Sequence, residues 1–140
     1  MTCEGTDLFT ESGADFCARD GVLDIAVIVA SKTACVGVSR QKNASRVTIH
    51  DGVIAIGNEA FRNCSSLTSV TIPNSVASIG SSSFINCRSL YLVKIPNSVT
   101  TIKEAAFAGC NKLKSVVIPD SVTVIDAQAF EGCSALASIT

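Results

Sequence analysis

The sequence repeats itself every 23 residues, and this period limits the possible folds more than any other feature does. Counted from the first isoleucine of each unit, the units are residues 49–71, 72–94, 95–117 and 118–140. They follow one another without an insertion or a deletion and cover 92 of the 140 residues. A period of this length is typical of a solenoid, in which each unit forms one coil that packs only against its neighbours.

Seven positions of every unit hold an apolar residue or Cys. In the second unit they are Ile72, Val76, Ile79, Phe84, Cys87, Leu90 and Val93. A single unit cannot bury seven such side chains, whereas stacked units can place each one on its equivalent in the next coil. We therefore expect continuous ladders of like residues along one core.

The order of residues within the unit predicts the course of the coil. The alternation in Leu67-x-x-Val70-x-Ile72 predicts a short strand, which Pro73 ends because proline has no N–H to donate. Residues 76–80 predict a second short extended segment on another side of the coil. The helix formers in 104–110 predict a helical or 3₁₀ turn, with Phe107 and Cys110 on its inner face.

The pattern Leu-x-x-Val-x-Ile-Pro-x-Ser-Val-x-x-Ile-x-x-x-x-Phe-x-x-Cys over residues 49–140 resembles the BspA-like leucine-rich repeats. This resemblance implies an α/β-type solenoid that is right-handed and curved, with mostly short parallel β-strands, short helical or 3₁₀ turns, and a parallel sheet on its concave face. It also implies adhesion to proteins, often at the cell surface of bacteria or protists. The sequence departs from the pattern at residues 50–52 and at Ser83, where the other units have Ala.

Residues 1–43 lack the repeat and are predicted to form an N-terminal cap or degenerate β-rich segment, with strands at 22–30 and 34–39. The coils are expected to begin at Ala44, so that residues 44–140 form the solenoid. Ile139-Thr140 stands in the middle of a strand motif. The sequence therefore predicts either a further repeat beyond the chain or an exposed end capable of end-to-end self-association.

The cysteine of each unit invites a metal-site interpretation, but the geometry argues against it. Stacked coils would place these thiols in a line about 4.8 Å apart, whereas a zinc site needs ligands that converge on one point. We expect them to be small buried side chains. The other three cysteines are Cys3, Cys17 and Cys35, and one pair of them can staple the N-terminal segment if the compartment is oxidising.

No arrangement of residues suited to catalysis is recognisable. His50 is the only histidine and occupies the turn slot after a strand, so neither a triad nor a histidine metal site can form. The carboxylates expected on the turns are solvent-facing in this interpretation: Glu59, Glu104, Asp126 and Glu131. The sequence predicts no enzyme, no cofactor and no metal.

Composition excludes further classes of function. Apolar residues make up 47% of the chain and charged residues 16%, with a net charge of −1, so no basic patch exists to bind nucleic acid. No apolar run approaches the roughly 20 residues of a membrane-spanning helix. The first residues lack a secretion signal. Two locations remain open: the cytoplasm, or the cell surface or exterior if the chain is part of a longer protein.

The remaining candidate is the outward face of the strands. One patch stands out there, with an aromatic beside aliphatic and cationic groups, a combination favoured in protein interfaces. The candidate binding residues are Tyr91, Leu92, Lys94, Lys114 and Val117, with Ser69, Thr71 and Arg46 on the same face. The predicted function is that of a non-enzymatic protein-binding or adhesion module of the BspA-like leucine-rich-repeat type, which binds through the concave sheet. A structural spacer or scaffold in a larger protein is the main alternative, and binding of an ordered surface such as ice or a glycan is a third.

Overall fold

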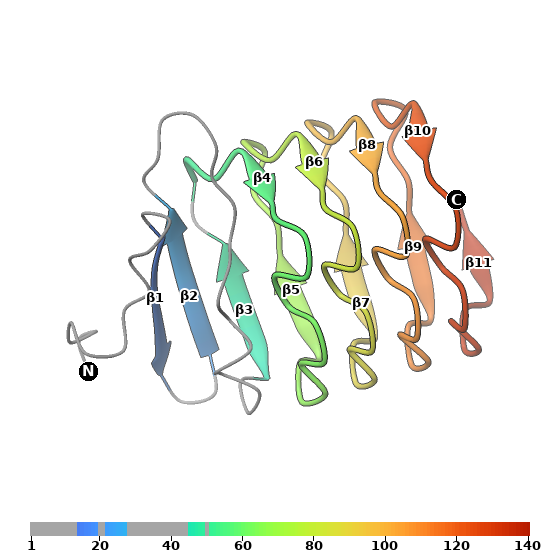
Figure 1. Ribbon diagram of the computed structural model, residues 1–140, viewed down its shortest axis with the longest axis horizontal. Coiled ribbons are helices and arrows are strands. Elements are labelled where there is room, and N and C mark those ends of the chain that lie inside the picture. Colours follow the sequence, from blue (N-terminus) through green and yellow to red (C-terminus); the bar gives the residue numbers. More distant parts are fainter. Residues whose placement is uncertain (1–13, 20–21, 28–44, 50) are drawn as a thin grey trace.

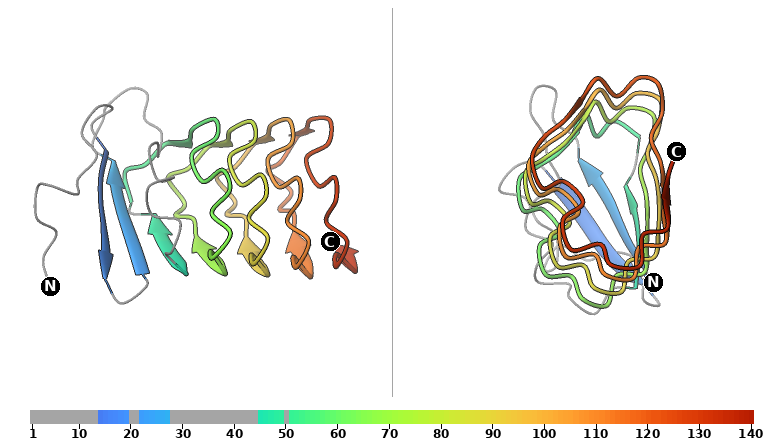
Figure 2. Two further views of the ribbon diagram at one scale, coloured as in Figure 1. Left: turned by 60° about the horizontal axis from the view of Figure 1, so that its bottom comes forward. Right: turned by 90° about the vertical axis from the view of Figure 1, so that its right-hand side faces the viewer.

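Equivalent residues of successive units lie side by side, because the chain winds into coils of 23 residues (Figure 1). The computed structural model describes residues 14–19, 22–27, 45–49 and 51–140. Within these residues the chain is a parallel β-solenoid of about four turns. Viewed from its end, the coils superimpose (Figure 2). The predicted solenoid is confirmed.

Two sheets run along the solenoid, one on each of two sides of the coils. The long sheet has seven strands in the order β1-β2-β3-β5-β7-β9-β11, and the short sheet has four in the order β10-β8-β6-β4. The strands are β1 (Ala14–Arg19), β2 (Val22–Val27), β3 (Arg46–Ile49), β4 (Ala55–Ile56), β5 (Ser69–Thr71), β6 (Ser78–Ile79), β7 (Leu92–Lys94), β8 (Thr101–Ile102), β9 (Ser115–Val117), β10 (Val124–Ile125) and β11 (Ser138–Ile139).

The register between strands equals the repeat. In the long sheet Val47 pairs with Val70, Val70 with Val93, and Val93 with Val116. In the short sheet Ile56 pairs with Ile79 and Ile79 with Ile102. Since side chains alternate between the two faces of a strand, a slip by one residue would turn the buried valines of the long sheet outward. The buried valines thus fix the register.

The core consists of the predicted ladders. In the second and third units all seven positions are buried. The phenylalanine rings stack almost parallel, with centroid separations of 5.0 Å from Phe61 to Phe84, 5.1 Å from Phe84 to Phe107, and 5.4 Å from Phe107 to Phe130. This separation is set by the step between coils, which the strand pairing holds at about 4.8 Å.

The turn predicted after the long-sheet strand is present in the second, third and fourth units. The carbonyl of Pro73 accepts a hydrogen bond from the amide of Val76. In the next two units the carbonyl of Pro96 accepts from Val99, and that of Pro119 accepts from Val122. The short strands β6, β8 and β10 follow, so the second extended segment is also confirmed.

The predicted helical turn is wrong, since the described residues contain no helix. Within 104–110, the amides of Ala106 and Ala108 donate to carbonyls three residues earlier, as in successive β-turns. The intervening amides of Ala105 and Phe107 instead donate to Ala127 and Ala129 in the next coil, at 3.0 and 2.8 Å. A helix would use all these amides within one coil. Half of them join adjacent coils here, so tertiary packing overrides the helix propensity of alanine.

Left-handed residues make these turns possible. Glu59, Ser82, Ala105 and Gln128 occupy one position of the unit and all have φ between 54° and 62°. A second left-handed position holds Asn63 and Asn86, and then Gly109 and Gly132. At Gly109 a Cβ atom would collide with the side-chain oxygen of Asn86. Glycine therefore suits this position by its φ and leaves room for the Asn86 side chain, whereas Asn holds the same position in the first two units.

The described part of the N-terminal segment extends the long sheet. β1 pairs antiparallel with β2, and β2 pairs in parallel with β3. The strand expected at 22–30 agrees with β2 over its described residues, whereas β1 was not expected. The assignment of 1–43 as a cap stays a prediction. Several predictions lie outside the described residues. They concern the strand expected at 34–39, the side chains of Cys3, Cys17 and Cys35, and His50.

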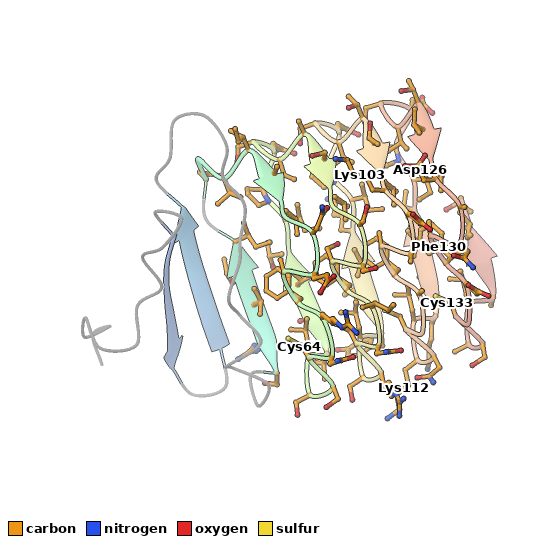
Figure 3. The ribbon with its side chains drawn as sticks, viewed as in Figure 1. Cys64, Lys103, Lys112, Asp126, Phe130 and Cys133 are labelled. Atoms are coloured by element: carbon orange, nitrogen blue, oxygen red, sulfur yellow. The ribbon has the colours of Figure 1, made fainter. Side chains whose placement is uncertain are left out.

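The last coil is less covered than the others. Ile125 and Ile139 are 48% and 50% exposed, whereas their equivalents in the third unit, Ile102 and Val116, are buried. Phe130 is partly exposed at the same end, where Figure 3 labels it. The predicted end-to-end self-association concerns this surface and stays a prediction.

Ser83 supplies a test of the core. It replaces the alanine of the other units, is fully buried, and its hydroxyl has no hydrogen-bond partner among the described residues. Removing an unpaired buried hydroxyl restores about 1–2 kcal/mol. Ser83→Ala should raise the free energy of unfolding by that amount in urea denaturation. The reciprocal change Ala106→Ser, at the equivalent position, should lower it. A stabilised Ala106→Ser variant would contradict the packing described.

Ala105 supplies a test of the turns. A non-glycine residue in the left-handed region costs roughly 1–2 kcal/mol, while glycine adds roughly 0.4–1 kcal/mol of entropy to the unfolded chain. Ala105→Gly should therefore stabilise the protein by roughly 0.5–1 kcal/mol. Ala77→Gly, at an exposed residue without positive φ, should destabilise it by a similar amount. Thermal unfolding of both variants measures the contrast, and equal destabilisation would refute the left-handed turn.

Candidate functional site

The outer face of the long sheet is built from two rows of outward side chains. The first row runs through Arg46, Ser69, Leu92, Ser115 and Ser138, and the second through Thr48, Thr71, Lys94, Val117 and Thr140. Most of these side chains are exposed, and Thr48 and Ser69 are partly so. The predicted orientation of these positions is confirmed.

A third row borders the sheet at the beginning of the strands. The amide of Tyr91 donates to the carbonyl of Thr68 at 3.1 Å, and the amide of Lys114 donates to the carbonyl of Tyr91 at 3.4 Å. Tyr91 and Lys114 therefore lie on adjacent coils. This row adds an aromatic ring and a cation to the edge of the outer face.

The predicted residues Tyr91, Leu92, Lys94, Lys114 and Val117 form one patch across two neighbouring coils, which we call the Tyr91 patch. Tyr91 is 50% exposed, Leu92 51% and Val117 58%. Lys94 pairs with Val117 in register, and Leu92 with Ser115. The long sheet thus brings together residues that lie as much as 26 positions apart in the sequence. Binding by this patch stays a prediction.

A groove beside the patch was missed by the sequence reasoning. It encloses about 750 Å³ over the ends of β3, β5 and β7. Its polar lining includes Thr48, Thr71, Lys94, Asn74, Asn97 and Asp51. Leu92 and Lys94 belong both to this strand-end groove and to the Tyr91 patch. The asparagines follow Pro73 and Pro96, and the recurrence of Pro-Asn after successive strands is the signal that could have revealed them.

The cysteine ladder is internal. Cys64, Cys87 and Cys110 are buried, and Cys133 is partly buried in the last coil. The thiols of Cys87, Cys110 and Cys133 donate to the carbonyls of Phe61, Phe84 and Phe107 in the preceding coil, at 3.1–3.2 Å. The expectation of small buried side chains holds for the inner coils. The thiol–carbonyl bond between coils was not foreseen.

Burial also suppresses the reactivity of these thiols. Loss of solvation raises the pKa of the Cys110 thiol to about 12, with a further contribution from the neighbouring Cys133. Desolvation likewise raises the pKa of Cys87 and Cys133. Thiolate is the nucleophilic and metal-binding form, so the inner thiols serve packing rather than chemistry.

The described residues offer no metal-binding cluster of His, Cys, Asp or Glu. Glu59, Glu104, Asp126 and Glu131 are exposed, as the sequence indicated. No helix able to cross a membrane occurs in the part of the chain that the structure describes.

Comparisons with known proteins agree with the fold. A family model described as the BspA type leucine rich repeat region, in six copies, matches residues 39–140. The structure is similar to that of a T. pallidum leucine rich repeat protein, with a TM-score of 0.71 and 25% identity over 95% of this chain and 71% of that one. A leucine-rich repeat protein from Bacteroides ovatus has a TM-score of 0.71 and 26% identity, and this chain covers 40% of its length.

A leucine rich cell surface protein from Faecalibacterium prausnitzii is also similar, with a TM-score of 0.56 and 25% identity over 94% of this chain and 54% of that one. A search of curated proteins found no match. The chain thus spans less than two thirds of the length of two of these three structural relatives.

The raised pKa of Cys110 gives stability a pH dependence. The folded thiol holds its proton more tightly than the unfolded one, so its stabilising effect is fully present below about pH 9 and is lost as the pH rises toward 12. At pH 10.5 the loss is on the order of 2 kcal/mol. The difference in unfolding free energy between the wild type and Cys110→Ala should shrink from pH 7 to pH 10.5. Cys133→Ala, at a partly exposed thiol, should change less; a pH-independent difference for Cys110→Ala would contradict this account.

Proposed function

We propose that this chain, which belongs to the BspA-type leucine-rich repeat family, binds another protein through the outer face of its long sheet. The observation that carries the proposal is the Tyr91 patch, in which three large apolar side chains stand about half exposed on adjacent coils. Exposed apolar groups gathered in one place are a feature of interaction surfaces. Tyr is one of the residues enriched at the centres of protein interfaces.

The patch is unusual within its own surroundings. At the position of Leu92, the neighbouring coils carry Ser69 and Ser115, which are small and polar, and at the position of Val117 they carry Lys94 and Thr140. An inward ladder position must be apolar in every coil, whereas an outward position carries no such requirement. The large outward side chains contribute little to the core, which favours a role in contact with another molecule.

The proposed setting is the cell surface. The support is the F. prausnitzii relative, which is described as a cell surface protein. We propose a non-enzymatic role, in keeping with a repeat family that is typically non-catalytic. The exposed carboxylates and buried thiols of the described coils agree with this.

A structural spacer is the second candidate. The observation in its favour is that most outward residues of the long sheet are Ser or Thr, without large side chains. In that case the coils would hold other parts of a longer protein apart, and the Tyr91 patch would have no partner.

The test is capture of surface proteins by the immobilised chain. Combining Tyr91→Ala with Lys94→Ala should abolish capture of those proteins that the wild type retains, because the centre of the patch is lost. Lys103→Ala is the matched control, since Lys103 follows β8 on the short-sheet side of the coil (Figure 3). Circular dichroism should remain unchanged in both variants.

Undiminished capture by the double variant would exclude the Tyr91 patch as the binding centre. Retention of no protein by the wild type, from extracts in which a known adhesin captures its ligand, would favour the spacer.

A further inference from the structure

From β3 to β11, the charged side chains on the outer face of the long sheet are all cationic. Arg46 and Lys94 occupy outward strand positions, and Lys114 directly precedes β9. No Asp or Glu occurs in β3, β5, β7, β9 or β11. The ion pair present in the described part of the chain joins Arg62 to Glu59, at 3.1 Å. The ammonium groups of Lys94 and Lys114 therefore have no described carboxylate within ion-pair distance.

The two lysines stand at opposite corners of the Tyr91 patch. Lys94 ends β7 and pairs with Val117 on the next coil, whereas Lys114 lies beside Tyr91 at the beginning of the strands. Measured along the strands, Lys94 lies three residues beyond Lys114, which corresponds to roughly 10 Å at the usual rise. Tyr91 and Val117 occupy the other two corners, and Leu92 lies on the edge between Tyr91 and Lys94. The apolar surface is thus bracketed by positive charge on one diagonal.

We propose that the Tyr91 patch binds an acidic, extended protein segment in which two carboxylates flank apolar side chains. The apolar side chains would pack among Tyr91, Leu92 and Val117, and the carboxylates would lie at Lys94 and Lys114. This inference rests on the proposed function and adds the chemistry of the partner. In an extended chain with polyproline II geometry, carboxylates three residues apart lie on the same side, about 9 Å from each other, which matches the spacing of the two lysines.

The strand-end groove gives the segment a path and a direction. It begins at Leu92 and Lys94 and continues over Thr71 and Thr48 toward Asp51. Its hydroxyl and amide side chains can pair with the peptide groups of an extended chain. Asp51 places a negative charge at the far end, so the acidic part of the partner belongs at the β7–β9 end. Asp120, in the turn after β9, makes no ion pair with either lysine.

Charge selects the partner in this arrangement, while the apolar side chains supply burial. Exposed complementary charges mainly accelerate association and exclude wrong partners. The attraction weakens when salt shortens the screening length from about 8 Å at physiological ionic strength to about 3 Å at 1 M. An apolar partner without carboxylates would lack this salt dependence, which separates the two possibilities.

The test uses three short fluorescent peptides that share a Leu-Leu centre and carry Asp, Ser or Lys on either side of it. Fluorescence anisotropy with the full chain should give a Kd for the Asp peptide roughly tenfold lower than that for the Ser peptide, with the Lys peptide weakest. The advantage of the Asp peptide should disappear in 1 M salt. Equal binding of the three peptides, or no binding of any, would overturn the partner class.

Charge-reversal variants locate the effect. Lys94→Glu combined with Lys114→Glu should remove the preference for the Asp peptide and favour the Lys peptide. Lys103→Glu is the matched control and should leave the preference unchanged. A preference for the Asp peptide that survives in the double variant would contradict the proposed site. Thermal unfolding checks that each variant is folded.

Failure of this inference is distinguishable from failure of the proposed function. If Tyr91→Ala with Lys94→Ala abolishes protein capture but the peptides show no charge preference, the patch binds a partner of another chemistry. If capture survives that double variant, the patch itself is excluded.

Discussion

Stacking of each coil on the next, at an offset of one 23-residue unit, is the interaction on which the other features depend. Strand pairing sets the step, and the phenylalanine rings lie 5.0–5.4 Å apart as a consequence. Alternate amides of the turn segments donate across the same gap, as from Phe61 to Ser83 at 2.7 Å and from Phe84 to Ala106 at 2.8 Å. Apolar burial and hydrogen bonding therefore impose the same register, and neither requires a helix.

This constraint divides the residues of a unit into two groups. Inward positions must repeat, because each side chain packs against its equivalent above and below. Outward positions need only tolerate a strand or a turn, so they are free to carry a surface specific to this chain. The Tyr91 patch consists of such outward residues, and such residues also supply the polar lining of the strand-end groove. Binding specificity can thus change without altering the core, which makes a repeat scaffold suitable for recognition.

The repeat made most of the fold of residues 49–140 predictable from the sequence. Seven recurring positions gave the ladders, Pro73 and its equivalents gave the turns, and alternation around Val70 gave the outward rows. The Tyr91 patch followed from the same register, because Leu92 and Val117 occupy equivalent sides of adjacent strands. These predictions needed no knowledge of distant contacts beyond the repeat itself.

Other features depended on contacts that the pattern does not encode. Alanine and glutamate in 104–110 favour a helix locally, but hydrogen bonds to the following coil are available only once the coils stack. Strand β1 lies outside the repeat, so no ladder indicated it. The strand-end groove arises from the shape of successive turns, and its asparagines resemble ordinary turn residues in the sequence.

The central claim is that the outer face of the long sheet binds another protein. Its most direct test is site-specific photo-crosslinking to the captured protein. A photoreactive amino acid in place of Leu92 would stand on the outer face of the long sheet, and one in place of Thr100 would stand exposed beside the short sheet. The account predicts a crosslinked product from position 92 and none from position 100. Crosslinking from position 100 alone would contradict it and move the binding surface to the other side of the coils.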